Sequence, residues 1–286
     1  MNSKLSNIKN IAWAIAIVVS LALLLVALGF AAFTRHRGEM ERPTVLIGEA
    51  AAARDAALAE AKKAEEQQAL QQSGGGGEVY VLGESGDAGQ AYLDSLTFLC
   101  DSALIGLRDY GLLKDGTATT QVWGSAAGNI PASTLGDFTI RYPGDGSEIS
   151  PIDAAMIAKP AQLVISLGTD SLTGTDEQTF ITGFESLIRG IQQVSPETAI
   201  IVCTITSVTI SYSGSDGLDF PIVNQANTWI ARVCADTGAF LVDVASSVSD
   251  SNGSLLTEYA SANGKTLNSA GLNQVLSYLR NHAIAY

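Results

Sequence analysis

Hydrophobic and polar positions follow three different patterns along this chain. Residues 11–33 form one uncharged apolar run, residues 47–72 are rich in alanine, glutamate, glutamine and lysine, and short apolar runs alternate with amphipathic stretches from Glu78 onward. The first pattern is typical of a membrane-spanning helix, the second of an exposed helix and the third of a globular α/β domain.

The apolar run predicts an uncleaved, single-pass anchor after a short tail, residues 1–10. As a helix, residues 11–33 would extend about 34 Å, enough for a hydrocarbon core of about 30 Å. The run is also longer than the apolar region of about 7–15 residues that is usual in a signal peptide. Positive charges flank both ends, so their count leaves the membrane topology open. These charges are Lys4 and Lys9 on one side and Arg35, Arg37 and Arg42 on the other.

Residues 34–72 are expected to form a juxtamembrane segment and a helical stalk. The large apolar residues Leu58 and Leu70 lie about 120° apart around a helix, so no heptad seam runs along it. A solvated stalk is therefore favoured over a weak coiled coil. Ser73 and the four glycines after it begin a flexible linker, residues 73–91, which leads into a domain over residues 92–286.

The third pattern predicts alternating strands and helices. Short apolar runs buried on both faces are typical of parallel strands, and an apolar stripe such as Leu272, Val275, Leu276 and Leu279 is typical of a covering helix. The succession favours a parallel five-stranded sheet with helices on both faces. The expected strands are 97–100, 119–123, 162–167, 199–205 and 239–242, and the expected helices are 103–113, 152–158, 177–194, 221–236 and 269–283.

Charge and cysteine content narrow the possible partners. The formal net charge is −13, and the part from Glu78 onward carries 8 Lys and Arg against 22 Asp and Glu, a net charge of −14. Such a surface repels phosphate backbones, so no nucleic-acid partner is expected. The three cysteines, Cys100, Cys203 and Cys234, have no metal-type spacing and are expected to be buried hydrophobes. No metal and no cofactor is expected.

Ligands of open parallel sheets bind at the carboxyl ends of the strands, where the strand order reverses. Three polar segments of this chain are expected to converge at that edge. They are residues 100–102 after the first strand, 168–172 after the third strand, and 263–268 before the last helix.

These three segments resemble the motif blocks of the SGNH (GDSL-like) hydrolase family. FLCDSALIGL is similar to F-I-G-D-S-x-x-x-G-L, VISLGTDSL to V-I-x-x-G-x-N-D-L, and NGKTLNSAGL to D-G-x-H-L-N-x-x-G. The resemblance extends from about Tyr92 to the C-terminus. It implies a flavodoxin-like three-layer α/β/α sandwich. It also implies, in active members, hydrolysis or transfer of ester or acetyl groups on lipids, carbohydrates or envelope polymers.

The departures from the family pattern fall on the reactive positions. Ser102 stands at the nucleophile position, with Cys100 in place of the preceding glycine. Asp170 stands where the family has the asparagine that donates to the oxyanion. Asn263 replaces the triad acid and Thr266 replaces the triad base.

A serine hydroxyl needs a base within about 2.6–3.2 Å to become a nucleophile. Thr266 is no more basic than Ser102, and His36 adjoins the predicted anchor. His282 lies 13 residues after Ser269, so the last helix should carry it about 20 Å from the site edge. Lys265 is the alternative base, because Ser-Lys pairs also catalyse acyl transfer.

Several candidate residues also have a purely structural interpretation. Ser102 is suited to cap the helix expected over 103–113. By the resemblance, Gly124 or Gly128 would supply the glycine of the oxyanion site, although a turn alone would explain both. Trp123 is the aromatic residue to consider for ligand binding, and core packing is the competing interpretation.

The sequence therefore predicts a membrane-anchored SGNH-like domain that is catalytically degenerate and binds a ligand or partner. A carbohydrate or envelope-polymer ligand would agree with the resemblance. The alternative is an active serine esterase or acetyl transferase that uses Ser102, and a third possibility is a structural domain without a ligand. By analogy with the family, the domain is expected outside the cytoplasm on a bacterial-type cell membrane.

Overall fold

A computed structural model describes residues 77–284. The predicted tail, anchor and stalk, His36 and most of the glycine joint lie outside the described residues. Within residues 77–284, every helix is too short or too polar to cross a membrane.

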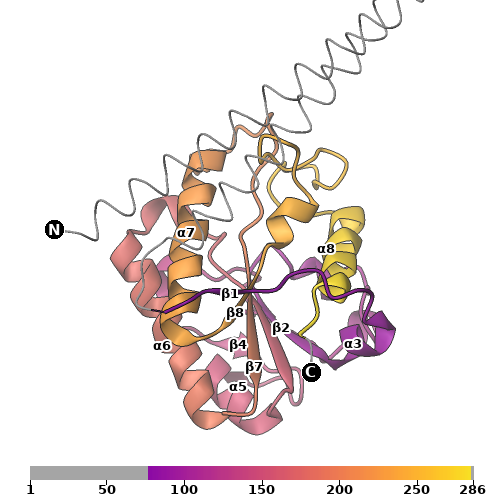
Figure 1. Cartoon of the computed structure of the whole chain (residues 1–286), viewed down its shortest axis with the longest axis vertical. Coiled ribbons are helices and arrows are strands. Elements are labelled where there is room, and N and C mark those ends of the chain that lie inside the picture. Colours follow the sequence, from indigo (N-terminus) through magenta and orange to yellow (C-terminus); the bar gives the residue numbers. More distant parts are fainter. Residues whose placement is uncertain (1–76, 285–286) are drawn as a thin grey trace, which may run out of the picture. The chain divides into compact units, whose positions relative to one another are not determined.

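The core of the molecule is a six-stranded parallel sheet with the strand order β1-β8-β7-β6-β2-β3. Figure 1 shows this sheet in the middle of the domain, with helices on both sides. A separate antiparallel pair, β4 (Ile140–Arg141) and β5 (Glu148–Ile149), lies outside this sheet. The strands of the main sheet are β1 (Tyr80–Val81), β2 (Leu96–Cys100), β3 (Val122–Trp123), β6 (Gln162–Ser166), β7 (Ala199–Cys203) and β8 (Phe240–Val242).

The prediction of five strands was wrong, because β1 adds a sixth. It lies in the segment assigned to the linker, residues 73–91, and pairs with β8 through Tyr80 and Val81. A strand of two residues is too short to produce an alternating or continuous apolar pattern. Its pairing depends on β8, which is far away in the sequence.

The helices connect successive strands and cover both faces. Asp176, Asp219 and Asn268 each accept a hydrogen bond from a backbone N–H in the first turn of α6, α7 and α8, respectively. The helices are α3 (Gly89–Ser95), α4 (Gly106–Asp109), α5 (Pro151–Ala158), α6 (Glu177–Val194), α7 (Phe220–Thr237) and α8 (Ser269–Asn281). Short 3-10 helices are η1 (Gly116–Ala118), η2 (Ala132–Thr134), η3 (Leu172–Gly174) and η4 (Val244–Ser247).

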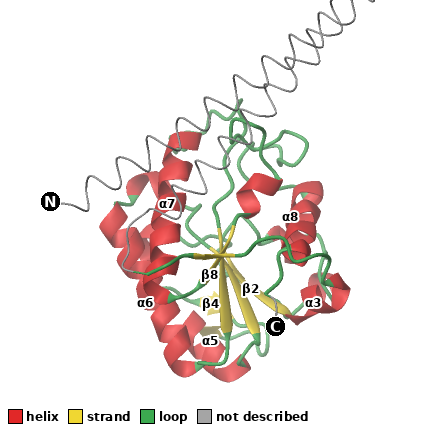
Figure 2. Cartoon of the chain, in the orientation of Figure 1, coloured by secondary structure: helices red, strands yellow, loops and turns green. Residues whose placement is uncertain are grey.

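Alternate residues of the central strands enter two separate hydrophobic clusters. In β6, Leu163 and Ile165 pack with α6 and α7 on one face, whereas Val164 packs with α8 on the other. Figure 2 shows α6 and α7 on one side of the strands and α3 and α8 on the other. The structure is thus the predicted three-layer α/β/α sandwich. Cys100, Cys203 and Cys234 are buried free thiols, as expected.

Candidate functional site

The site lies where the strand order reverses. After β2, the chain adds β3 on one side and then places β6 on the other side of β2. The loops that leave β2 and β6 therefore meet at the carboxyl edge. They carry Asp101 and Ser102 after β2, and Gly168, Thr169 and Asp170 after β6.

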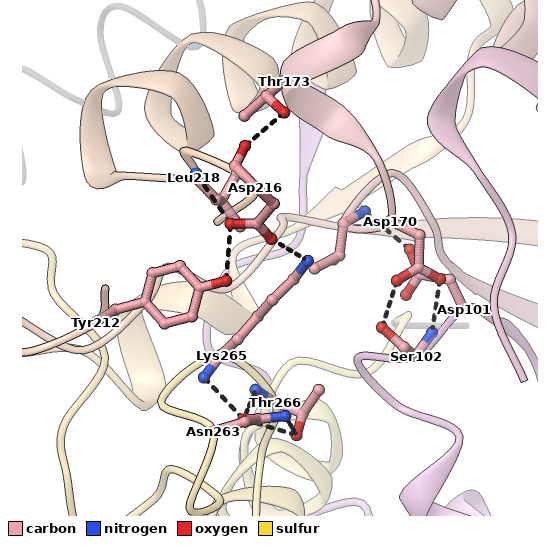
Figure 3. Close-up of polar contacts among 11 residues, drawn as sticks. Asp101, Ser102, Asp170, Thr173, Tyr212, Asp216, Leu218, Asn263, Lys265 and Thr266 are labelled. Atoms are coloured by element: carbon pink, nitrogen blue, oxygen red, sulfur yellow. Dashed lines mark hydrogen bonds and ion pairs between the residues drawn. The ribbon is translucent and has the colours of Figure 1, made fainter. Parts of the chain in front are cut away.

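Ser102 is held by the carboxylate of Asp170 (Figure 3). Its hydroxyl donates to Oδ1 of Asp170 at 2.5 Å, and its backbone N–H donates to Oδ2 at 3.3 Å. Ser102 does not cap a helix, so that interpretation was wrong. Only Gly106–Asp109 of the expected helix 103–113 forms α4, whose N-cap, Ile105, makes no side-chain cap bond. The hydroxyl of Ser102 is instead committed to a partner 68 positions away.

Asp170 accepts hydrogen bonds from two different backbone segments. Besides the Ser102 N–H, its Oδ2 accepts the N–H of Ile130 at 2.9 Å. Its backbone carbonyl accepts the N–H of Ala132 at 2.7 Å. Two N–H groups that converge on one oxygen resemble the donor arrangement that stabilises an oxyanion. Here the protein's own carboxylate occupies that position.

Asp101, which lies in the predicted segment 100–102 but was given no role there, joins the two loops. Its Oδ2 accepts the N–H groups of Gly168 and Thr169 at 2.9 and 2.8 Å, and its Oδ1 accepts that of Ala103 at 3.0 Å. The side chain is buried, and this burial, reinforced by the charge of Asp170, raises the pKa of Asp101 to about 7. The three N–H bonds oppose the rise. An acidic residue directly before Ser102 was the available sequence signal.

Gly168 is required at the start of the β6 loop. Its φ angle is +111°, and a Cβ there would lie 2.8 Å from the ring of Phe180. A residue with a side chain would displace the backbone N–H that Asp101 accepts.

Thr266 and Asn263 interact with each other in their own loop. Asn263 Oδ1 accepts the backbone N–H groups of Lys265 and Thr266 at 2.9 and 3.0 Å, and its amide donates to Thr266 Oγ1 at 3.1 Å. Within the described part of the chain, no hydrogen bond joins either residue to Ser102. Figure 3 shows the pair apart from the contact between Ser102 and Asp170.

Lys265 binds a partner other than Ser102. Its ammonium group lies 3.0 Å from Oδ2 of Asp216, and Oδ1 of the same carboxylate accepts the hydroxyl of Tyr212 at 2.7 Å. The Lys265 side chain is only 17% exposed, so this ion pair fixes its position. The contact that a Ser-Lys pair requires is not present in this arrangement.

The structure places the three predicted binding residues in the buried core or in a turn. Trp123 is buried, with its ring edge against Tyr142, so it lies in the core rather than at a ligand surface. Gly124 is buried where a Cβ would meet Ile105, and Gly128 has a φ of +76° in a turn. The N–H that reaches Asp170 belongs to Ile130, which sequence reasoning missed because it follows the glycine-rich stretch.

His282 lies at the C-cap of α8. Its ring stacks on Tyr278 with centroids 3.7 Å apart, and its Nδ1 lies 2.8 Å from the Tyr278 carbonyl. The adjacent Ala283 N–H donates to Ser85 Oγ. These contacts agree with the structural interpretation of His282 and hold its ring within the last turn of its own helix.

Comparisons with known proteins add a family match to this geometry. The model of the GDSL-like lipase/acylhydrolase family matches residues 67–271. No curated protein matches the chain. Among solved structures, similar chains include a proposed platelet activating factor from Streptococcus pneumonia and a carbohydrate esterase family 3 protein from Talaromyces cellulolyticus.

The likeness to these two structures is distant in sequence. The first is 14% identical, with a TM-score of 0.49, and the match covers 82% of this chain and 97% of the other. The second is 13% identical, with a TM-score of 0.44, and the match covers 65% of this chain and 93% of the other. Such identities are too low to transfer a substrate.

Proposed function

Because the chain belongs to the GDSL-like lipase/acylhydrolase family, we propose that it is a catalytically degenerate member of that family. In this proposal, residues 11–33 anchor it in the membrane, and the domain binds a ligand or partner at the cell envelope. The loss of catalysis and the membrane anchor rest on different observations.

The loss of catalysis is supported by one observation, the hydrogen bonding of Asp170. The Ser102 hydroxyl points at a carboxylate, and carboxylates, with a reference pKa of about 3.9, are much weaker bases than imidazole, at about 6.5. The same carboxylate occupies the place where the N–H groups of Ser102 and Ile130 converge. An oxyanion formed at Ser102 would therefore meet negative charge.

The expected cost of this arrangement is large. Loss of one oxyanion donor raises an activation barrier by roughly 2.7–4 kcal/mol, and a like charge at that place raises it further. A missing general base removes a further factor of about 10²–10⁴ in rate. Thr266 and Lys265 are bonded to Asn263 and Asp216 respectively, so neither compensates in this arrangement.

Covalent labelling of the full chain tests this proposal. Membranes that carry the wild-type protein, Ser102→Ala or the exposed-serine control Ser133→Ala are treated with a fluorophosphonate probe and assayed with a short-chain ester. We expect no labelling and no hydrolysis that depends on Ser102. Labelling that is present in the wild type and in Ser133→Ala but lost in Ser102→Ala would instead support an active esterase or acetyl transferase.

The membrane anchor is supported by the uncharged run over residues 11–33. We expect the full chain to remain in the membrane pellet after alkaline carbonate extraction, and a chain that begins at Glu78 to be released. In intact cells, added protease should digest a domain that lies outside the cytoplasm. Release of the full chain would contradict the anchor, and survival of the domain would contradict its location.

A further inference from the structure

A polar pocket lies beside the site, between the loop that follows β7 and the loop that precedes α8. Its volume is about 310 Å³. We call it the Tyr212 pocket, and its lining includes Thr209, Ser211, Tyr212, Ser213, Asn263 and Gly264. Ser102 and Asp170 are not part of the lining. Asn263, at the position of the family's triad acid, is the residue that the pocket shares with the predicted site.

Hydrogen bonds between the two loops hold the walls of the pocket in place. The Thr209 N–H donates to the Gly264 carbonyl at 2.9 Å. The Tyr212 hydroxyl donates to Asp216 in the same loop, and Asp216 also binds the ammonium group of Lys265 in the other loop. The tyrosine ring is thereby held between the loops without a ligand. Such preorganisation reduces the entropy that binding would cost.

Gly264 leaves room for this arrangement. Its φ angle is +70°, and a Cβ there would lie 2.8 Å from Thr209 Oγ1 and 3.4 Å from the Tyr212 ring. A side chain there would therefore press on Thr209 and come into contact with the ring. The absence of one at this position keeps the pocket open next to the ring.

The chemistry of the lining selects a neutral, polar ligand. Every lining residue is uncharged. The hydroxyls of Thr209, Ser211 and Ser213 can both donate and accept hydrogen bonds, whereas the Asn263 oxygen already accepts two backbone N–H groups. The Tyr212 ring is partly buried against the hydrophobic core and adds an apolar surface on its exposed side. The nearest charges, Lys265 and Asp216, neutralise each other at 3.0 Å. The domain's excess of acidic residues disfavours anions.

We infer that the Tyr212 pocket binds a neutral sugar residue. A sugar ring presents hydroxyls around its edge and C–H groups on its faces, which match the hydroxyl-rich wall and the tyrosine ring. The volume lies at the small end of the usual range for ligand pockets, about 300–1,000 Å³, and suits one or two rings. This inference rests on the proposed function, because it names the ligand class of a domain without esterase activity. It places the ligand against Tyr212 rather than against Ser102.

Saturation-transfer NMR on the full chain in lipid nanodiscs tests the inference. The probes are methyl β-D-glucopyranoside and methyl N-acetyl-β-D-glucosaminide, with glucuronic acid as the anionic comparison. The variants are Tyr212→Ala, Ser213→Trp, which fills the pocket from an exposed position, and Tyr110→Ala, which removes an exposed tyrosine elsewhere. Far-UV circular dichroism checks that each variant is folded.

We expect at least one neutral glycoside to receive saturation from the wild type and from Tyr110→Ala. The signal should fall at least tenfold in Tyr212→Ala and in Ser213→Trp, and glucuronic acid should give a weaker signal than the neutral probes. The inference is overturned if no neutral probe responds, if glucuronic acid responds more strongly, or if the folded Ser213→Trp variant binds as well as the wild type.

The two proposals fail in different measurements. Ser102-dependent labelling by the fluorophosphonate would overturn the loss of catalysis, and the sugar signal would then report a substrate subsite. Lost sugar binding with an unreactive Ser102 would overturn the Tyr212 pocket alone.

Discussion

The carboxyl group of Asp101 is almost completely buried, and its burial makes the free energy of unfolding depend on pH. Burial, together with the charge of Asp170, raises the pKa of Asp101 from 3.8 to about 7. The folded protein thus holds a proton between about pH 4 and pH 7 that the unfolded chain releases. By linkage, the free energy of unfolding must fall as the pH rises through this window.

We therefore expect the wild type to be most stable near pH 4 with respect to this group, and to lose stability up to about pH 7. The upper limit of the change is about 4 kcal/mol, from 1.36 kcal/mol per pKa unit. Urea denaturation at a series of pH values measures it. Asp101→Asn should lose most of this slope, whereas the exposed control Asp94→Asn should keep it. An unchanged slope in Asp101→Asn would contradict the assignment.

Among the helices, the start of α8 is joined to the loop that contains Glu258 and Ala260, whereas the capping side chains of α6 and α7 bond only within their own first turns. Asn268 accepts the Gly271 N–H at 3.0 Å, and its amide donates to the carbonyls of Glu258 and Ala260 at 2.8 and 2.9 Å. Asp219 at the start of α7 has only its capping bond, from Ile222 at 3.0 Å. Asn268 therefore joins α8 to the preceding loop, whereas the side chain of Asp219 only caps α7.

We expect Asn268→Ala to lower the free energy of unfolding by about 2–4 kcal/mol, and Asp219→Ala by about 1 kcal/mol. A lost N-cap costs roughly 1 kcal/mol, and each further hydrogen bond adds roughly 0.5–1.5 kcal/mol. Midpoints of urea denaturation check the order, and equal losses in both alanine variants would refute it.

At the scale of the whole domain, the segment before Tyr92 is part of the fold. The N–H groups of Leu82, Ser85 and Ala88 donate to the carbonyls of Leu241, Asn281 and Arg280 at 2.8, 2.8 and 2.9 Å. Asp87 adds an ion pair with Arg280 at 2.7 Å. These contacts join β1 and the segment after it to β8 and α8.

A chain that begins at residue 92 should therefore be less stable than one that begins at residue 78. Three backbone hydrogen bonds and the burial of Val79 together contribute about 3–7 kcal/mol. Thermal and urea denaturation of the two chains measure the difference, with the full chain in nanodiscs as the reference for the native fold. Identical midpoints would show that the domain begins at residue 92, as the sequence pattern predicted.

The layered fold and the edge that holds the site could be predicted from the order of apolar and polar residues alone. Helix α6 begins and ends at the predicted residues, because Asp176 caps a long amphipathic stretch and Pro196 follows soon after Val194. The convergence of the loops after β2 and β6 followed from the alternation of strands and helices. The anchor stays a prediction, since it lies outside the described residues.

The contacts of the site residues, in contrast, depend on how distant segments pack together. The partners of Asp170 come from Ser102 and Ile130, which lie 68 and 40 positions away, and Asp101 binds the loop that carries Asp170. Lys265 is near Thr266 in sequence yet pairs with Asp216 across another loop. Local pattern is set by the backbone's own periodicity, whereas a hydrogen bond between distant loops depends on where packing places both ends.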